Sequence, residues 1–462
     1  MIRLLRDLIP SNVLTLLLTE TVVIISCFVI ACFFLLPVDP LVYMLYDWGI
    51  GRVFIATATI ILALYFHDLY SEIRVRSRLL LAQQVLTVIG MAFLFQALLF
   101  YANSELILPR WVMMFGGGLS LVAVTGWRSF YSTVVLRALG EERMLFLGSN
   151  GLLVDIAQYI RQHQELGTSL LGYISEIPNP SLEECVPHLG GVAELRSLAG
   201  KLRPDVVVVG LSERRNRTPL ADLLEMRFSG IRIQEAATTF ENTLKRVSLK
   251  DLRPSQLIYT GELGPRPGMV PLQVAYSRLI ALFGLVVFSP IMLIIAVAMK
   301  VSSRGPALYR QTRVGWQGRQ FTLYKFRSMQ EHAEAQTGAV WATRDDPRVT
   351  PLGRWLRRLR LDELPQFVNV LRGEMSIVGP RPERPEFVAT LAEHIPFYRQ
   401  RLCVRPGITG WAQINHKYGD TIEEAARKLE YDLYYIKNLS PALDLYVVLN
   451  TLKTVLLQRG AQ

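Results

Sequence analysis

Residues 355–382 read WLRRLRLDELPQFVNVLRGEMSIVGPRP and place three arginines directly before an acidic pair, Asp362 and Glu363. The three arginines are Arg357, Arg358 and Arg360. A short helix is predicted to begin at the pair and to end at Gly373. Basic side chains beside acidic ones suit a phosphate group, and a helix N-terminus adds unpaired N–H groups that bind anions. The stretch therefore predicts a site that handles phosphate, in which Asp362 is either a metal ligand or a nucleophile.

A second interpretation of Asp362 is structural. An aspartate before an apolar run is commonly a helix N-cap, and Pro365 would then lie in the first turn, where proline is tolerated. Under the first interpretation, the positive charge nearby should lower the pKa of Asp362 and keep the carboxylate ionised.

The composition of the 462-residue chain is that of a membrane protein. Apolar residues make up 51% of it and the mean hydropathy is +0.27, both too high for an ordinary soluble protein. The formal net charge of +11 fits anionic lipid headgroups and the retention of positive loops in the cytoplasm. Because no zinc-finger spacing or single-strand-binding pattern accompanies this charge, nucleic acid is not an expected partner. The four cysteines are scattered and predict neither a disulfide framework nor a zinc site.

Four apolar segments predict a block of four transmembrane helices over residues 1–140, because each is near the roughly 20 residues that cross a bilayer. The segments are 13–36, 50–66, 79–101 and 111–135. Arginines border their cytoplasmic ends, at Arg3, Arg6, Arg74, Arg76, Arg78, Arg128 and Arg137. This bias places the N-terminus and everything after residue 137 in the cytoplasm. Glu20 and Gln96 are interpreted as polar residues that hold helices together, not as a transport path.

Residues 141–267 predict a soluble α/β domain of Rossmann-like type. MLFLGSNG reads as a buried strand that ends in a glycine turn, and DVVVVG, at 205–210, reads as another buried strand. Gly148 and Gly151 form GxxG and not the full GxGxxG fingerprint of a dinucleotide site. A degenerate nucleotide fold that serves regulation or formation of a homodimer fits at least as well as a working cofactor site. The Pro- and Gly-rich residues 245–268 are the predicted linker.

The segment at 274–300 predicts a re-entrant membrane helix. It contains 21 uncharged, mostly apolar residues between Arg278 and Lys300, with Ser289 and Pro290 in the middle. Proline removes a helical hydrogen bond and kinks the chain, and a serine hydroxyl can satisfy the freed carbonyl. A spanning helix would carry the arginine-rich remainder out of the cytoplasm, so we favour a hairpin that returns to the same leaflet over a kinked spanning helix.

Two further motifs carry positive charge. In YKFRSM, Lys325 and Arg327 alternate with apolar residues, which predicts a strand with one cationic face, although such a face can also simply be solvated. In VGPRPERPEF, Arg381 lies between Pro380 and Pro382. The prolines restrict the backbone, so the guanidinium is presented to a diphosphate with little entropy to lose.

Together, KFRSM, LDELPQFVNVLRGEMSIVGPRPE, RPGITGWAQIN and YDLYYIKN resemble the bacterial sugar transferase family of monotopic polyprenyl phosphate sugar-1-phosphate transferases. The resemblance covers residues 272–460, and the preceding regions resemble the long form of the family, which initiates exopolysaccharide or O-antigen units. It implies an α-rich transferase domain at 268–462 on the cytoplasmic face of the bacterial inner membrane. It also implies transfer of a sugar-1-phosphate from a UDP-sugar to polyprenyl phosphate, with release of UMP.

The resemblance implies a role for each motif residue. Asp362 would be the nucleophile that forms a phosphosugar intermediate, Glu363 would assist as metal ligand or base, and Mg²⁺ would be required and held by this pair. The implied substrate-binding residues are Arg357, Lys325, Arg327, Pro380, Arg381, Pro382 and Asp432, and the implied break of the re-entrant helix is Ser289 with Pro290. Two alternatives stay open at this point: a glycosyltransferase that moves only the sugar and releases UDP, and an inactive membrane sensor or scaffold with a nucleotide-binding domain.

Overall fold

The computed structural model describes residues 11–70, 75, 77–135, 141–163, 166–211, 219–249, 264–265, 268–302, 305–330, 348–416 and 421–456. Most of the predicted linker at 245–268 lies outside the described residues, as do the predicted flanking arginines Arg3, Arg6, Arg74, Arg76 and Arg137. The chain forms two compact units, Met1–Glu235 and Ala236–Gln462.

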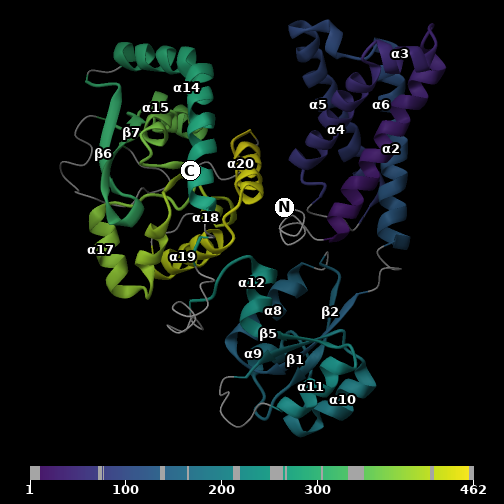
Figure 1. Ribbon diagram of the computed structural model, residues 1–462, viewed down its shortest axis with the longest axis vertical. Coiled ribbons are helices and arrows are strands. Elements are labelled where there is room, and N and C mark those ends of the chain that lie inside the picture. Colours follow the sequence, from purple (N-terminus) through teal and green to yellow (C-terminus); the bar gives the residue numbers. More distant parts are fainter. Residues whose placement is uncertain are drawn as a thin grey trace. The chain divides into compact units, whose positions relative to one another are not determined.

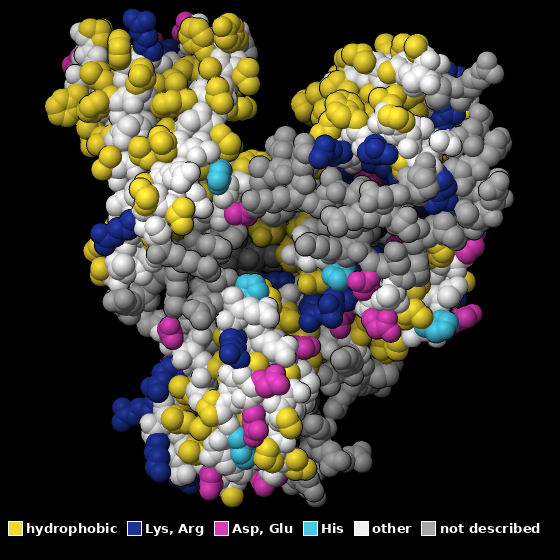
Figure 2. Space-filling model, turned by 180° about the vertical axis from the view of Figure 1, so that it is seen from behind, with side chains coloured by type: hydrophobic (Ala, Val, Ile, Leu, Met, Phe, Trp, Pro, Cys, Tyr) yellow, Lys and Arg dark blue, Asp and Glu magenta, His cyan; other side chains and the backbone are white. Residues whose placement is uncertain are grey.

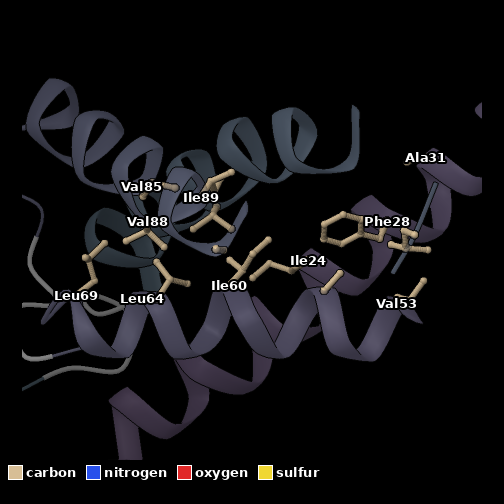
Figure 3. Packing of buried hydrophobic residues seen from close by; sticks show 14 of the residues in the cluster. Ile24, Phe28, Ala31, Val53, Ile60, Leu64, Leu69, Val85, Val88 and Ile89 are labelled. Carbon is tan, nitrogen blue, oxygen red and sulfur yellow. The ribbon is translucent and has the colours of Figure 1, made fainter. Parts of the chain in front are cut away.

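The first unit begins with long apolar helices (Figure 1). They are α2 (Ser11–Leu35), α4 (Gly49–Phe66), α5 (Arg78–Ala102) and α6 (Arg110–Phe130). Helix α6 continues as the π-helix η2 (Tyr131–Val135). Two short elements, α3 (Pro40–Tyr46) and η1 (Ser104–Leu106), lie between the long helices. Within the described part of the chain, five helices are long and apolar enough to cross a membrane, and the fifth is α14 of the second unit. Figure 3 shows how apolar side chains such as Ile24, Ile60 and Val88 meet between these helices.

Close packing in this block depends on small and paired polar residues. A Cβ on Gly116 would lie 2.5 Å from the ring of Phe28, so glycine lets α6 approach α2. Arg128, predicted as a flanking charge, is instead buried and lies with its Nε 2.6 Å from Oε1 of Glu20. Glu20 also accepts a hydrogen bond from the hydroxyl of Tyr70 at 2.7 Å. The charge of Arg128 therefore holds helices together inside the block.

The first unit continues as a parallel five-stranded sheet in the order β3-β2-β1-β4-β5. Its strands are β1 (Glu142–Gly148), β2 (Thr168–Ile174), β3 (His188–Gly190), β4 (Val206–Gly210) and β5 (Arg232–Glu235). Its helices are α8 (Gly151–Gln162), α9 (Pro180–Glu183), η4 (Val192–Glu194), α10 (Leu195–Leu202) and α11 (Leu220–Phe228). Gly148 has φ +113°, and a Cβ there would lie 2.3 Å from the carbonyl oxygen of Gly210. The parallel sheet confirms the predicted Rossmann-like domain.

The second unit surrounds two small sheets with helices. Its elements are α12 (Ala236–Leu244), α14 (Met269–Ser302), β6 (Leu308–Val314), η5 (Trp316–Gly318), β7 (Gln320–Phe326), α15 (Pro351–Arg358), η6 (Leu361–Glu363), α16 (Gln366–Leu371), β8 (Ser376–Val378), α17 (Pro385–His394), η7 (Tyr398–Cys403), β9 (Gly407–Thr409), α18 (Trp411–Asn415), α19 (Ile422–Lys437) and α20 (Pro441–Leu456). Strands β6 and β7 form an antiparallel hairpin, and β8 pairs with β9 in parallel.

Helix α14 turns sharply along its length (Figure 1) and contains Pro290. Proline cannot donate to the carbonyl four residues before it, which is that of Val286, and the Ser289 hydroxyl donates to this oxygen at 2.9 Å. The predicted role of the serine in satisfying the freed carbonyl is thus confirmed. Before the turn, Gly284 packs against the ring of Phe367 in α16. After it, Ile295 packs in a cluster with residues of β7 and α15.

The outward face of α14 is apolar. Its exposed side chains include Leu279, Phe283, Val286, Leu293, Ile294 and Val297. Figure 2 shows a patch of apolar side chains over the part of the second unit that contains α14, with Lys and Arg side chains bordering the patch. A surface of this kind suits lipid with charged headgroups at its edge.

Helix α12 and the residues up to Leu249 belong to the second unit, although they precede the predicted boundary at 267. Nζ of Lys437 in α19 lies 2.8 Å from Oε2 of Glu241, and Arg246 lies 3.1 Å from Oε2 of Glu430. The indole N–H of Trp411 donates to the carbonyl oxygen of Lys245 at 2.9 Å. The first part of the predicted linker is therefore packed against α18 and α19.

Candidate active site

The acidic pair lies in a tight turn between two helices. Thr350 caps α15, which ends near Arg358, and Arg360 then adopts a left-handed conformation with φ 53°. The 3-10 turn η6 follows and carries Asp362 and Glu363, whose side chains are both buried. A left-handed arginine is uncommon and marks a turn that its surroundings hold in place.

The structure does not support the N-cap interpretation of Asp362. Helix α16 begins at Gln366, its N-cap position is Pro365, and no side chain among the described residues caps it. The predicted end of the helix is confirmed, since Gly373 follows α16 with φ +76°. Asp362 is therefore held in a turn ahead of the helix, and its burial needs an explanation other than capping.

Three cationic side chains surround Glu363. Its Oε1 lies 3.3 Å from Nζ of Lys325 in β7 and 3.1 Å from Nη2 of Arg381, and its Oε2 lies 3.8 Å from Nη1 of Arg360. Burial alone would raise the pKa of Glu363, but Lys325, Arg381 and Arg360 outweigh burial and lower the pKa to about 2. Glu363 is thus firmly ionised at neutral pH.

Asp362 behaves in the opposite way, which corrects the prediction that nearby charge lowers its pKa. Burial and the adjacent carboxylate of Glu363 raise the pKa of Asp362, and Lys325, Arg357 and Arg381 only partly oppose this rise. The sequence showed the arginines but not how deeply the pair is buried. A buried carboxyl with a raised pKa beside an ionised one is a common feature of sites that do chemistry.

Arg357 comes from the last turn of α15. Its Nε donates to the hydroxyl of Ser328 at 2.8 Å. A Cβ on Gly353 would lie 2.0 Å from the carbonyl oxygen of Ser328, so only glycine lets α15 approach the chain after β7 this closely. Ser328 was not singled out from the sequence, although its place in YKFRSM is a signal that could have found it.

Lys325 and Arg327 do not share one strand. Lys325 lies in β7 opposite Tyr309 and points to Glu363, while β7 ends at Phe326. Arg327 follows the strand, and its backbone N–H donates to the carbonyl oxygen of Ala307 at 2.9 Å. Lys325 therefore joins β7 to the acidic pair through Glu363.

Arg381 reaches the pair from the loop after β8. This strand is anchored to α14, because Gln273 donates to the carbonyl oxygen of Val378 at 3.1 Å and to Asp444 at 2.8 Å.

Asp432, predicted among the substrate-binding residues, lies elsewhere. Its carboxylate is buried in α19 and pairs with Arg401 at 2.8 Å. Arg401 is a site-related residue that the sequence did not reveal.

The residues present fit the implied Mg²⁺. Mg²⁺ is commonly held by one or two carboxylates and completed by substrate phosphates and water. Within the described residues no group of three or more His, Cys, Asp or Glu side chains could hold a metal by itself. Burial, and after it repulsion by the adjacent carboxylate of Glu363, raises the pKa of Asp362, and a bound cation would relieve this repulsion.

Comparison with known proteins matches the two parts of the chain separately. The bacterial sugar transferase family matches residues 270–458, and the family described as a CoA-binding domain matches residues 65–223. The chain is 34% identical to "UDP-glucose:undecaprenyl-phosphate glucose-1-phosphate transferase" of Xanthomonas campestris pv. campestris, over 78% of this chain and 76% of that protein.

Two other relatives match a smaller share of the chain. The chain is 45% identical to "UDP-N-acetylgalactosamine-undecaprenyl-phosphate N-acetylgalactosaminephosphotransferase" of Aeromonas hydrophila, over 48% of this chain and about half, 52%, of that protein. It is 46% identical to "UDP-glucose:undecaprenyl-phosphate glucose-1-phosphate transferase" of Escherichia coli, over 39% of each chain. The match extends along most of the Xanthomonas protein, and the buried acidic pair among cations and the parallel sheet agree with it. The chain therefore belongs to the bacterial sugar transferase family, in its long form.

Proposed function

We propose that the protein transfers a sugar-1-phosphate from a UDP-sugar to polyprenyl phosphate and releases UMP. The observation that carries the proposal is the buried pair Asp362 and Glu363 among Lys325, Arg357, Arg360 and Arg381. Anionic phosphates need such positive charge before a carboxylate can approach them. The names of the relatives support the same reaction, and because those names include different sugars, the proposal is for UDP-sugars as a class.

The proposed reaction has two steps. An Asp362 carboxylate oxygen attacks the phosphorus that bears the sugar, the bond from that phosphorus to the bridging oxygen breaks, and UMP leaves with the electron pair. An oxygen of polyprenyl phosphate then attacks the same phosphorus and breaks its bond to Asp362. The products are polyprenyl diphosphate sugar and the regenerated carboxylate.

Glu363 is assigned to orientation rather than to proton transfer. A carboxylate with a pKa of about 2 is a weak base at neutral pH. It instead holds Lys325 and Arg381 where they face the substrate phosphates. Mg²⁺, when bound by Asp362 and Glu363, would neutralise charge on the diphosphate. Arg357 would hold a phosphate near Asp362, whose ionised form it favours.

The site is next to the proposed membrane surface. Leu361, the residue before Asp362, packs in the same cluster as Ile295 and Met299 of α14. We place α14 as a re-entrant helix and the four helices α2, α4, α5 and α6 as spans of the bacterial inner membrane, with both soluble parts in the cytoplasm. A lipid acceptor and a soluble donor can then use one site in turn. Exopolysaccharide or O-antigen synthesis is the proposed context, and a homodimer remains a prediction.

The test is a trapping experiment. Wild-type protein in nanodiscs is mixed with a UDP-sugar and Mg²⁺ without polyprenyl phosphate, quenched, digested and examined by mass spectrometry. The peptide that contains Asp362 should gain the mass of the sugar phosphate, and Asp362→Asn should lose both this adduct and roughly three or more orders of magnitude of turnover. UDP in place of UMP among the products would favour the sugar-only transferase, and no turnover with any UDP-sugar would favour the scaffold.

A further inference from the structure

The Arg381 loop, residues 380–382, is held by its carbonyl oxygens. Three successive carbonyls each accept a hydrogen bond: that of Pro380 from the N–H of Gly407 at 3.0 Å, that of Arg381 from Nη2 of Arg401 at 3.0 Å, and that of Pro382 from Nη1 of Arg313 at 2.9 Å. Prolines have no N–H, so this loop has few donors with which to fix itself. Its position depends on donors that come from elsewhere in the second unit.

Arg401 is the most constrained of these donors. Its side chain is only 6% exposed, and Nε and Nη2 lie 3.1 and 2.8 Å from Oδ2 of Asp432. Its Nη1 donates to the hydroxyl of Tyr398 at 2.8 Å. The planar guanidinium fork is thus fixed on two sides, and Nη2 also donates to the carbonyl oxygen of Arg381.

The same residue connects this support to the acidic pair. The backbone of Arg381 accepts from Arg401, and its side chain reaches Oε1 of Glu363 at 3.1 Å. A buried ion pair is weak support for stability by itself, because desolvation cancels much of the attraction. Desolvation does not, however, reduce the ability of such a pair to hold a neighbouring residue in place.

We infer that Arg401, oriented by Asp432, is a positioning residue that sets Arg381 for the diphosphate of the UDP-sugar. The inference rests on the proposed function and deepens it. Asp432, expected as a substrate ligand, acts in this arrangement through Arg401 without touching the substrate. The acceptor lipid phosphate does not depend on Arg381 in the same way, so loss of Arg401 should affect the two substrates unequally.

The test compares Arg401→Lys and Asp432→Asn with Arg246→Lys in the full-length protein in nanodiscs. Arg246 is the matched control, because it pairs with Glu430 on the same helix, α19, and its side chain is also largely buried. Lysine keeps the charge of Arg401 but cannot reach Asp432, Tyr398 and the carbonyl of Arg381 at once. The KM for UDP-sugar should rise roughly ten- to one-hundredfold in both test variants, as expected when a hydrogen bond to a charged group is misplaced. The KM for polyprenyl phosphate should stay within about twofold.

Hydrogen–deuterium exchange of the peptide at residues 376–384 gives a second readout that needs no activity. Exchange there should be faster in Arg401→Lys and Asp432→Asn and unchanged in Arg246→Lys. If Arg401 acts through Arg381, adding Arg401→Lys to Arg381→Ala should raise the UDP-sugar KM no further.

Two results would overturn the inference. The first is an unchanged UDP-sugar KM together with unchanged exchange at residues 376–384 in a folded variant. The second is an equal loss of activity toward both substrates, in proportion to the loss of folded protein. If Arg401→Lys does not fold, Asp432→Asn decides between the same outcomes. Failure of the wild type to release UMP from any UDP-sugar would count against the proposed function, and the exchange measurement would still decide whether Arg401 holds the loop.

Discussion

Nζ of Lys325 lies 3.3 Å from Oε1 of Glu363, and this contact joins β7 to the turn η6 across 38 positions of sequence. Arg381 and Arg360 also face Glu363, so the cationic side chains of the site gather mainly around one of the two carboxylates. Asp362 is left with a raised pKa and Glu363 with a pKa of about 2. Two neighbouring acids are therefore expected to affect stability with opposite signs.

The first prediction is that Asp362→Asn raises the melting temperature at neutral pH while Glu363→Gln lowers it. The folded pKa of Asp362 is raised, so ionised Asp362 costs stability once the pH rises through that value, and a neutral amide removes the cost. The folded pKa of Glu363 is lowered to about 2, so its stabilisation is present above about pH 4.5 and is lost as the pH falls toward 2. Removing one partner of a buried pair costs about 3–5 kcal/mol.

Thermal unfolding of the detergent-solubilised protein at pH 7 checks this prediction. Glu393→Gln, at an exposed position of α17, is a control carboxylate outside the acidic pair. A lower melting temperature for Asp362→Asn, or an unchanged one for Glu363→Gln, would show that the charge balance in the pair differs from the one described.

The sequence predicted the parts of this site that are local, and it failed where burial or distant contacts decide. The Ser289 and Pro290 pattern correctly gave a hydroxyl for the freed carbonyl of Val286, because both residues act within one turn. The pKa of Asp362 was predicted with the wrong sign, since a list of nearby arginines does not show desolvation. Arg401 was missed because its partner Asp432 is 31 residues away and no periodicity links them.

A second prediction concerns Asn369, which ties α16 to β7. Its fully buried amide donates to the carbonyl oxygen of Thr322 at 2.7 Å, and its Oδ1 accepts from the N–H of Tyr324 at 3.2 Å. Asn369→Ala should cost about 2–4 kcal/mol, because it leaves buried backbone groups without these partners. It should also lower turnover, since Lys325 follows Tyr324 directly.

Thermal unfolding and UMP release measure both effects. Asn450→Ala is the matched control, because the amide of Asn450 donates to Tyr446 within its own helix, α20. Equal losses in the two variants would indicate that Asn369 is an ordinary buried polar residue without a role in placing Lys325.

The third prediction separates the second unit from the first. A truncated chain that begins at Ala236 keeps the contacts of Glu241, Lys245 and Arg246 with α18 and α19, whereas one that begins at Pro265 loses them. Both should release UMP in nanodiscs, because the acidic pair and its cations lie in the second unit. The shorter chain should melt several degrees lower, since Glu430 and Trp411 lose their partners.

Differential scanning fluorimetry and UMP release compare the two chains. Equal melting temperatures would mean that residues 236–249 contribute nothing to the fold of the second unit. Inactivity of the longer chain, when it is folded and bound to membrane, would place part of the active site in the first unit.

The last prediction concerns the path of α14 through the membrane. If α14 is re-entrant, the residues before it and after it lie on the same side, and its apolar outward face enters only one leaflet. Single cysteines at Asp39, Gly264 and Gln320 report on the connection before α3, the chain before α14 and the start of β7. They are introduced into a protein in which the half-buried Cys185 and Cys403 are replaced by serine. In intact spheroplasts an impermeant maleimide should label Asp39→Cys, whereas Gly264→Cys and Gln320→Cys should react only after permeabilisation. Labelling of Gln320→Cys from outside, with Gly264→Cys still protected, would mean that α14 spans the bilayer and that the acidic pair faces away from the cytoplasm. That outcome is physically costly, because it would carry Arg310, Arg313 and Arg319 across the membrane against the distribution of positive charge that orients membrane proteins.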